Sequence, residues 1–256
     1  MTKVNKKIHI ENLLPAVRNA GSKIMDVYNS NPEIEIKKDG SPVTIADKAA
    51  ESILISRIKE LHPNIPIVSE ENPDSHLIKT AKEFFLVDPL DGTKEFLKHD
   101  GKGSFTVNVA YIRDHDPIMG IVYAPALNRL FYANSIDGAF EANTNGIKKI
   151  KIRQTAKKSI VAVASSSHQD KATIEWLQNN KIFKTVSIGS SLKFCLVACG
   201  EADVYPRFGP TMEWDTAAGD AILRAAGGKV ENTDGTKFKY GKKNFKNSSF
   251  IAKGDF

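Results

Sequence analysis

Apolar residues recur at helical spacing in two stretches near the start of the chain. The first stretch runs from Ile10 to Tyr28, and the second follows Thr44 and ends near Leu61. Thr44 and Asp47 have the spacing of a capping arrangement at the start of the second predicted helix. A purely structural role for Asp47, as an acceptor for backbone amides at that N-terminus, is therefore open.

The middle of the chain is rich in short predicted strands. Apolar or alternating runs between turn residues predict strands at 34–37, 63–69, 84–87, 105–112, 118–123, 129–133, 139–142 and 148–152. Closely spaced strands with short turns are typical of a largely antiparallel sheet. We therefore expect an N-terminal α+β domain, residues 1–153, built around such a sheet.

The order of predicted elements changes after residues 150–158, where we place a domain boundary. Strands are expected at 159–164, 185–188 and 203–208, and helices at 172–177, 192–199 and 213–226. Alternation of strands and helices is typical of an α/β arrangement. We expect a second domain, residues 154–256, of this kind.

The sequence 88–93, Asp-Pro-Leu-Asp-Gly-Thr, follows the apolar run 84–87 directly. We expect Pro89 and Gly92 to end the strand sharply, which leaves two carboxylates and a hydroxyl on a tight turn. Asp88 and Asp91 repel each other there unless a cation lies between them, and a hard divalent ion with oxygen ligands fits that need. An exposed turn with no ligand is the simpler alternative for these residues alone.

Other carboxylates and hydroxyls lie at strand ends or helix starts. Glu70 and Glu71 follow the strand 63–69, although adjacent glutamates are commonly solvated. Asp215 falls in the first turn of a predicted helix, where the macrodipole favours its charge with or without a metal. Residues 189–191 are Gly-Ser-Ser, and Lys193 lies close by. This pattern is a weak signal, taken by itself, for a site where a helix N-terminus and the two serine hydroxyls face an anion.

Composition narrows the functional classes. The 256 residues are 41% hydrophobic and 26% charged, with a net charge of +6 and no apolar run near the ~20 residues that cross a bilayer. The N-terminus lacks a signal-peptide core, and Cys195 and Cys199 are expected to be reduced thiols, so we expect a cytoplasmic protein. The scattered lysines accompany no nucleic-acid-binding motif, and they favour anionic small-molecule substrates.

Four segments together resemble a known family. The segments 42–47, 68–71, 87–96 and 213–219 resemble, in this order, the motifs of the inositol monophosphatase superfamily. The resemblance covers essentially the whole chain and implies a layered α-β-α-β-α sandwich and a Mg2+-dependent, lithium-sensitive phosphomonoesterase. Segments 92–96, 188–195 and 205–210 look like its 3′(2′),5′-bisphosphate nucleotidase branch, the CysQ type.

The resemblance also implies roles for single residues. It implies that magnesium is held by Glu70, Asp88, the carbonyl of Leu90, Asp91 and Asp215. The implied catalytic residues are Asp47 and Thr93, which orient and deprotonate the attacking water, together with the metal ligand Glu70. The implied substrate contacts are Leu90, Asp91, Gly92, Thr93, His168, Ser190, Lys193, Arg207 and Asp215.

These features predict hydrolysis of adenosine 3′,5′-bisphosphate, and of its sulfated form, with Mg2+ as cofactor. Inositol 1-phosphate or a sugar bisphosphate is the alternative substrate within the superfamily. A non-catalytic polyanion-binding protein is the alternative of another class, since the surface is basic. The sequence leaves open a monomer or homodimer, and peripheral attachment to the cytoplasmic face of a membrane.

Overall fold

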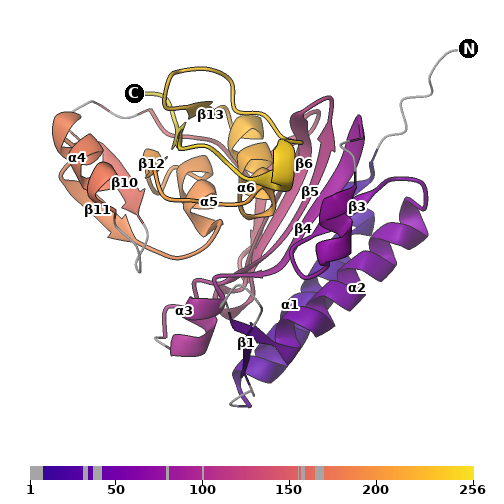
Figure 1. Cartoon of the computed structure of the whole chain (residues 1–256). Coiled ribbons are helices and arrows are strands. Elements are labelled where there is room, and N and C mark those ends of the chain that lie inside the picture. The colour runs from indigo at the N-terminus through magenta and orange to yellow at the C-terminus, as the bar shows by residue number, and fades with distance from the viewer. Residues whose placement is uncertain are drawn as a thin grey trace, which may run out of the picture.

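The computed structural model describes residues 8–30, 34–36, 42–78, 81–99, 101–154, 156, 159–164 and 170–256, with the backbone alone for 34–36 and 42–44. Two sheets organise the molecule, a large one from the first half of the chain and a smaller one from the second (Figure 1). Within these residues, no helix combines the length and the apolar character that a membrane span needs.

The large sheet has the strand order β3-β4-β5-β6-β7-β8-β9. Its strands are β3 (Ile67–Ser69), β4 (Glu83–Asp91), β5 (Thr106–Arg113), β6 (Asp116–Ala124), β7 (Arg129–Asn134), β8 (Gly138–Asn143) and β9 (Gly146–Ile150). The pair β3 and β4 is parallel, and every later pair is antiparallel. The predicted, largely antiparallel sheet is therefore confirmed. Strands β1 (Ile34–Ile36) and β2 (Pro42–Thr44) form a separate antiparallel pair.

The smaller sheet has the order β11-β10-β12-β14-β13. Its strands are β10 (Val161–Ala164), β11 (Lys184–Ser187), β12 (Val204–Arg207), β13 (Lys229–Asn232) and β14 (Phe250–Lys253). Strands β11 and β12 run parallel to β10, whereas β14 is antiparallel to β12 and β13. The large sheet ends at Ile150 and this sheet begins at Val161, so we propose that 1–153 and 154–256 are separate domains.

Helices fill the remaining three layers. They are α1 (Leu14–Tyr28), α2 (Ile45–Leu61), α3 (Thr93–Lys98), α4 (Lys171–Asn179), α5 (Leu192–Ala198) and α6 (Glu213–Ala225), with short 3-10 helices η1 (Ile10–Asn12), η2 (Pro73–Leu77), η3 (Pro125–Leu127) and η5 (Lys243–Phe245). Helices α1 and α2 cover one face of the large sheet, α5 and α6 lie between the sheets, and α4 covers the outer face of the smaller sheet (Figure 1). The predicted α-β-α-β-α sandwich is confirmed.

Strand β4 is the second strand of the large sheet and is buried on both faces. Phe85 and Val87 belong to the core under α1 and α2, while Phe84 and Leu86 belong to the core under α5 and α6. A strand buried on both faces is apolar at successive positions rather than at alternate ones. This burial explains the continuous apolar run before Asp88.

The prediction that Pro89 ends this strand is wrong. Strand β4 continues to Asp91, and its register against β5 shifts between Asp88 and Asp91. A bulge of this kind adds a residue to one strand, bends it locally and accommodates a proline that cannot donate to the ladder. Gly92, with φ of +90°, then turns the chain into α3, a conformation that glycine adopts readily.

Gly120 allows α6 to lie directly on the large sheet. A Cβ at this position would lie 2.2 Å from the Ala218 carbonyl oxygen and 2.9 Å from the Ala221 Cβ. We expect Gly120→Ala to lower the free energy of unfolding by about 1–3 kcal/mol or more, because relief requires α6 to shift. Denaturant unfolding measures this loss. Gly254→Ala is the control, because its Cβ would lie 3.5 Å from its nearest neighbour, the Ile152 Cβ; equal losses in both variants would contradict the explanation.

Candidate active site

Three of the predicted metal ligands form one cluster. Glu70 follows β3, Asp88 lies in β4, and Asp215 lies in the first turn of α6. Each offers a carboxylate oxygen, and these oxygens all lie within 4.8 Å of one another. Three separate segments of the chain thus bring a carboxyl group to the same point.

Backbone hydrogen bonds fix the positions of these carboxylates. The amide of Glu70 donates to the Val87 carbonyl (3.1 Å), which places Glu70 beside Asp88. The Leu90 amide donates to Asp88 Oδ1 (3.1 Å), and the Met212 amide donates to Asp215 Oδ2 (2.8 Å). Asp215 therefore caps α6 and also faces the cluster, which leaves its role as a metal ligand a prediction.

The electrostatics of the cluster favour a cation. Burial raises the pKa of Asp88 well above its usual range, and the nearby charges of Glu70, Asp91 and Asp215 raise it further. Burial, with the charges of Asp91 and Glu70, likewise raises the pKa of Asp215 well above its usual range. Oxygen ligands from carboxylates suit a hard divalent ion, and such an ion would relieve the mutual repulsion. The residues present therefore fit Mg2+.

Asp91 lies beyond the bulge and has different partners. Its Oδ2 accepts a hydrogen bond from the Ser191 amide (2.5 Å). Burial raises the pKa of Asp91, and the Lys193 ammonium opposes that rise. Lys193 is itself buried, which lowers its pKa to about 8, and its Nζ donates to the carbonyls of Ser190 (2.6 Å) and Ile188 (3.4 Å). The charges of Asp91 and Lys193 thus influence each other next to the three-carboxylate cluster.

The predicted water-activating residues are Asp47 and Thr93. Asp47 is buried in the first turn of α2, which packs along β4. The Thr93 hydroxyl donates to the Leu90 carbonyl (3.2 Å). A carbonyl oxygen has two lone pairs, so Leu90 can accept this bond and still offer an oxygen to a metal. The pairing of Thr93 with Asp47 stays a prediction.

A cavity of about 140 Å3 opens beside the cluster. Its lining includes Asp91, Gly92, Lys94, Glu95, Gly189, Ser190, Ser191, Lys193, Phe194, Tyr205, Arg207, Thr211, Asp215 and Thr216. Arg207 Nη2 donates to the Pro210 carbonyl (3.1 Å), and the buried Nε of Arg207 has no hydrogen-bond partner among the described residues. Three cationic side chains, Lys94, Lys193 and Arg207, therefore line the same space as Asp215.

One expectation about the 189–191 segment is wrong. The Ser191 hydroxyl does not face an anionic ligand, because it bonds to Asn108 Oδ1 (2.6 Å) and lies 2.9 Å from Thr106 Oγ1. The amide of Ser191 is used by Asp91, so the anion at this point is a carboxylate of the protein itself. Ser190 does line the cavity, whereas the predicted contact His168 lies outside the described residues.

Several cavity residues have no counterpart among the sequence predictions. Glu95, Tyr205 and Thr211 line the cavity, and Asn108 supports Ser191 at its edge. Glu95 lies in the first turn of α3, three residues after Gly92, and Gly92 is itself a predicted substrate contact, so this spacing is a usable signal. Tyr205 falls within the segment 205–210 that resembles the nucleotidase branch, whereas no local pattern marks Thr211.

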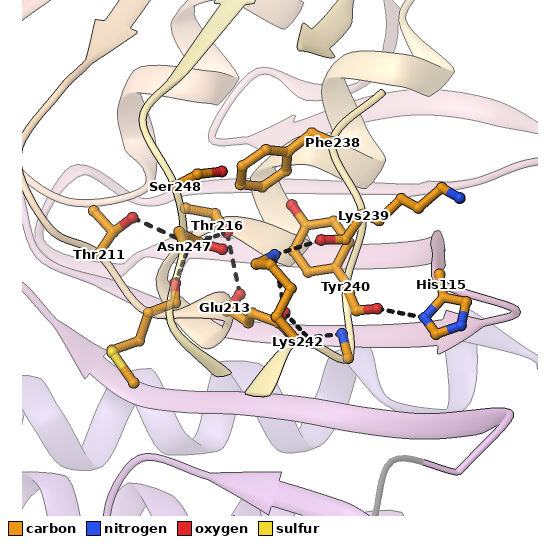
Figure 2. A network of polar contacts seen from close by, with 12 residues as sticks. His115, Thr211, Glu213, Thr216, Phe238, Lys239, Tyr240, Lys242, Asn247 and Ser248 are labelled. Carbon is orange, nitrogen blue, oxygen red and sulfur yellow. Dashed lines mark hydrogen bonds and ion pairs between the residues drawn. The ribbon is translucent and has the colours of Figure 1, made fainter. Parts of the chain in front are cut away.

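A buried polar network anchors the start of α6, which carries Asp215. Glu213 is fully buried and accepts from the amides of Gly241 (2.7 Å) and Lys242 (2.8 Å) and from Lys242 Nζ (2.9 Å). Asn247 Nδ2 donates to Thr211 Oγ1, the Met212 carbonyl and Thr216 Oγ1 at 2.7–3.1 Å. Figure 2 shows these bonds between the 240–248 segment and the start of α6, with His115 at the outer end.

Known proteins resemble the chain over nearly its full length. The model of the inositol monophosphatase family matches residues 9–254. The 3′(2′),5′-bisphosphate nucleotidase CysQ of Salmonella typhimurium is 45% identical over 235 residues, which cover 90% of this chain and 93% of that protein. The protein of the same name from Escherichia coli K12 is 43% identical over 234 residues, with the same coverage.

A solved structure agrees with these sequence relatives. The crystal structure of CysQ from Bacteroides thetaiotaomicron, a bacterial member of the inositol monophosphatase family, has a TM-score of 0.84 at 34% identity. The match covers 96% of this chain and 97% of that one. Sequence and fold agree over the whole length, and the chain belongs to the inositol monophosphatase family.

Proposed function

We propose that this protein is a Mg2+-dependent phosphatase that hydrolyses adenosine 3′,5′-bisphosphate to AMP and phosphate. The named activity of the relatives supports this substrate, since they cover nearly the whole chain at 43–45% identity. The observation that carries the proposal is that Asp215 belongs both to the carboxylate cluster and to the lining of the cavity that Lys193 and Arg207 also line. A phosphoryl group at the cluster is thus adjacent to a space suited to a second anion.

Glu70, Asp88 and Asp215 are the proposed metal ligands, with the Leu90 carbonyl and Asp91 extending the site. When bound, Mg2+ supplies a hydroxide nucleophile at neutral pH and neutralises charge on the phosphoryl oxygens. The net reaction forms a bond between the water oxygen and phosphorus, breaks the bond from phosphorus to the 3′-oxygen, and leaves a proton on that oxygen. Hydrolysis of a phosphate monoester is very slow without catalysis, so the reaction needs both the hydroxide nucleophile and the neutralisation of phosphoryl charge.

Asp47 and Thr93 are the proposed proton acceptors for the attacking water. In the present geometry the Thr93 hydroxyl donates to the Leu90 carbonyl. To serve the water, this hydroxyl turns its hydrogen toward the Asp47 carboxylate and accepts the water's hydrogen bond on its own oxygen. Asp47 is buried, which keeps bulk water from competing for that position.

Lys193 and Arg207 are the proposed partners of the phosphate that does not react. The unpartnered Nε of Arg207 leaves a donor for an anionic oxygen, and the guanidinium suits phosphate geometry. Lys193 is a buried cation among backbone carbonyls, so a nearby phosphate favours its charged form. Binding energy from this remote phosphate positions the scissile one.

Phosphate release from adenosine 3′,5′-bisphosphate and from inositol 1-phosphate, measured side by side with Mg2+, tests the proposal. We expect fast turnover of the nucleotide, little turnover of inositol 1-phosphate, and inhibition by Li+. Preference for inositol 1-phosphate would be compatible with the proposed metal site but would refute the proposed nucleotide substrate. Absence of turnover on both, with salt-dependent RNA binding, would favour the polyanion-binding alternative.

A further inference from the structure

The three clustered carboxylates come from two different layers. Glu70 and Asp88 are held to each other by the parallel pairing of β3 with β4 and by the bond from the Glu70 amide to the Val87 carbonyl. Asp215 is on α6, between the sheets, and no strand pairing relates it to Glu70. The separation of Glu70 from Asp215 therefore depends on side-chain contacts between layers.

His76 contacts the residue before each of these two carboxylates. It lies in η2, shortly after Glu70, and its Nε2 is 2.8 Å from the Ser69 carbonyl oxygen. Its ring stacks on the Trp214 indole, with ring centroids 4.6 Å apart and planes at 21°. Ser69 immediately precedes Glu70, and Trp214 immediately precedes Asp215. One imidazole thus connects the two peptide segments that present the carboxylates.

Both ends of this connection are rigidly held. Ser75, next to His76, accepts a hydrogen bond from the Ser69 amide (3.0 Å) and donates to the Asn72 carbonyl (2.6 Å), which fastens η2 to the Glu70 segment. Trp214 is only 5% exposed and packs against Phe245 as well as His76. A displacement of the imidazole would therefore be transmitted to both segments.

The hydrogen bond to the Ser69 carbonyl determines which nitrogen of the His76 imidazole carries a proton. A carbonyl oxygen can only accept, so Nε2 must carry a proton and donate it to Ser69. The hydrogen bond fixes the ring's direction, and the stacking on Trp214 fixes its plane. These constraints are those of a positioning residue rather than of a solvated surface histidine.

We propose that His76 is a positioning residue that holds Glu70 and Asp215 at the separation a divalent cation requires. The proposal rests on the metal-dependent function above, because the separation matters only when a cation bridges the two carboxylates. Mg2+ demands nearly ideal octahedral geometry at about 2.0–2.1 Å, so a small shift of one ligand weakens binding. His76 would act through Ser69 and Trp214, without touching metal or substrate.

Three substitutions separate the two contacts. His76→Phe keeps an aromatic ring on Trp214 and removes the donor to Ser69. His76→Gln keeps an amide donor of similar reach and removes the ring, while His76→Ala removes both. Isothermal titration of the metal-free protein with Mn2+, which also prefers oxygen ligands, measures metal affinity directly without any turnover.

We expect His76→Ala to weaken Mn2+ binding about 10-fold, the lower end of the effect of removing a residue that orients metal ligands. The Phe and Gln variants should lie between wild type and Ala, so partial rescue by either contact supports the proposal. Asn180→Ala is the matched control, because it removes a bond of the same kind, from a side-chain nitrogen to the Trp176 carbonyl (2.8 Å), at the end of α4 and outside the network that anchors α6. It should leave Mn2+ affinity unchanged.

Thermal unfolding of the same variants in EDTA gives the second readout. A purely structural role would lower the unfolding temperature and leave Mn2+ affinity within about twofold of wild type, and this result would overturn the proposal. Equal losses of affinity in His76→Ala and Asn180→Ala would also overturn it. If His76→Ala fails to fold, the Phe and Gln variants decide the question. Failure of the wild-type protein to bind Mn2+ would instead refute the proposed function itself.

Discussion

Asp88→Asn is expected to reduce turnover of adenosine 3′,5′-bisphosphate by about a thousandfold or more while making the metal-free protein more stable. The asparagine side-chain amide is a poorer metal ligand than a carboxylate. A metal ion lowers the activation barrier by several kcal/mol, and losing that stabilisation corresponds to about three powers of ten in rate. In the absence of metal, however, the substitution removes a buried charge that Glu70, Asp91 and Asp215 repel. Activity with saturating Mg2+ and thermal unfolding in EDTA measure the two opposite effects.

The gain in stability should depend on pH. The pKa of Asp88 is raised in the folded protein, so its contribution to stability is present below its unfolded pKa of about 4 and is lost as pH rises through the folded pKa. The amide of the Asp88→Asn variant does not ionise, so the advantage of the variant in EDTA should be small near pH 4 and larger at neutral pH. A gain of about 1 kcal/mol would raise the unfolding temperature by about 2–4 °C.

Asp26→Asn is the control for this experiment, because Asp26 is an exposed carboxylate in α1 that pairs with Lys23. It should change neither turnover nor stability in EDTA appreciably. Turnover of Asp88→Asn close to that of wild type would refute the ligand assignment. A variant that loses activity but is no more stable without metal would refute the account of charge repulsion in the cluster.

Arg207→Ala is expected to lower kcat/KM for adenosine 3′,5′-bisphosphate by about 10- to 100-fold, with little effect on adenosine 3′-monophosphate. The range corresponds to the loss of one hydrogen bond to a charged group, about 1.5–3 kcal/mol. The effect should be confined to the bisphosphate because Arg207 lines the cavity proposed for the second phosphate. Steady-state kinetics on the two nucleotides give the comparison.

Arg207→Lys provides the matched variant. It keeps the positive charge but loses the planar fork and the bond from Nη2 to the Pro210 carbonyl, so we expect partial activity on the bisphosphate. Equal losses on both nucleotides in Arg207→Ala would remove its proposed role in recognising the second phosphate. Such a result would point instead to a general change in the shape of the cavity.

Much of the fold follows from the local pattern of residues. The apolar periodicity of α1, α2 and α6 and the turns between the strands of the large sheet can be predicted from sequence, because helices and strands impose periods of 3.6 and 2 on the buried positions. Element ends are less secure. The prediction for Pro89 fails because a bulge opposite β5 absorbs it, and a bulge depends on the partner strand.

The sequence also determined which carboxylates are candidates for the site. Glu70, Asp88 and Asp215 could be chosen as carboxylates at strand ends or helix starts, and the structure brings these three together. Their local context could not show this convergence, because each is equally acceptable as a cap or a solvated residue. The resemblance of four ordered motifs supplied what local context lacked.

Only the tertiary structure decided how the site is supported. The bond from the Ser191 amide to Asp91 and the stacking of His76 on Trp214 each join residues that are 100 or more positions apart. Such contacts have no sequence period, because they depend on how α5, α6 and η2 pack across the large sheet. The sequence by itself therefore determined the elements and the charged groups, whereas packing between layers decided their partners, their pKa values and the distances that a metal ion would meet.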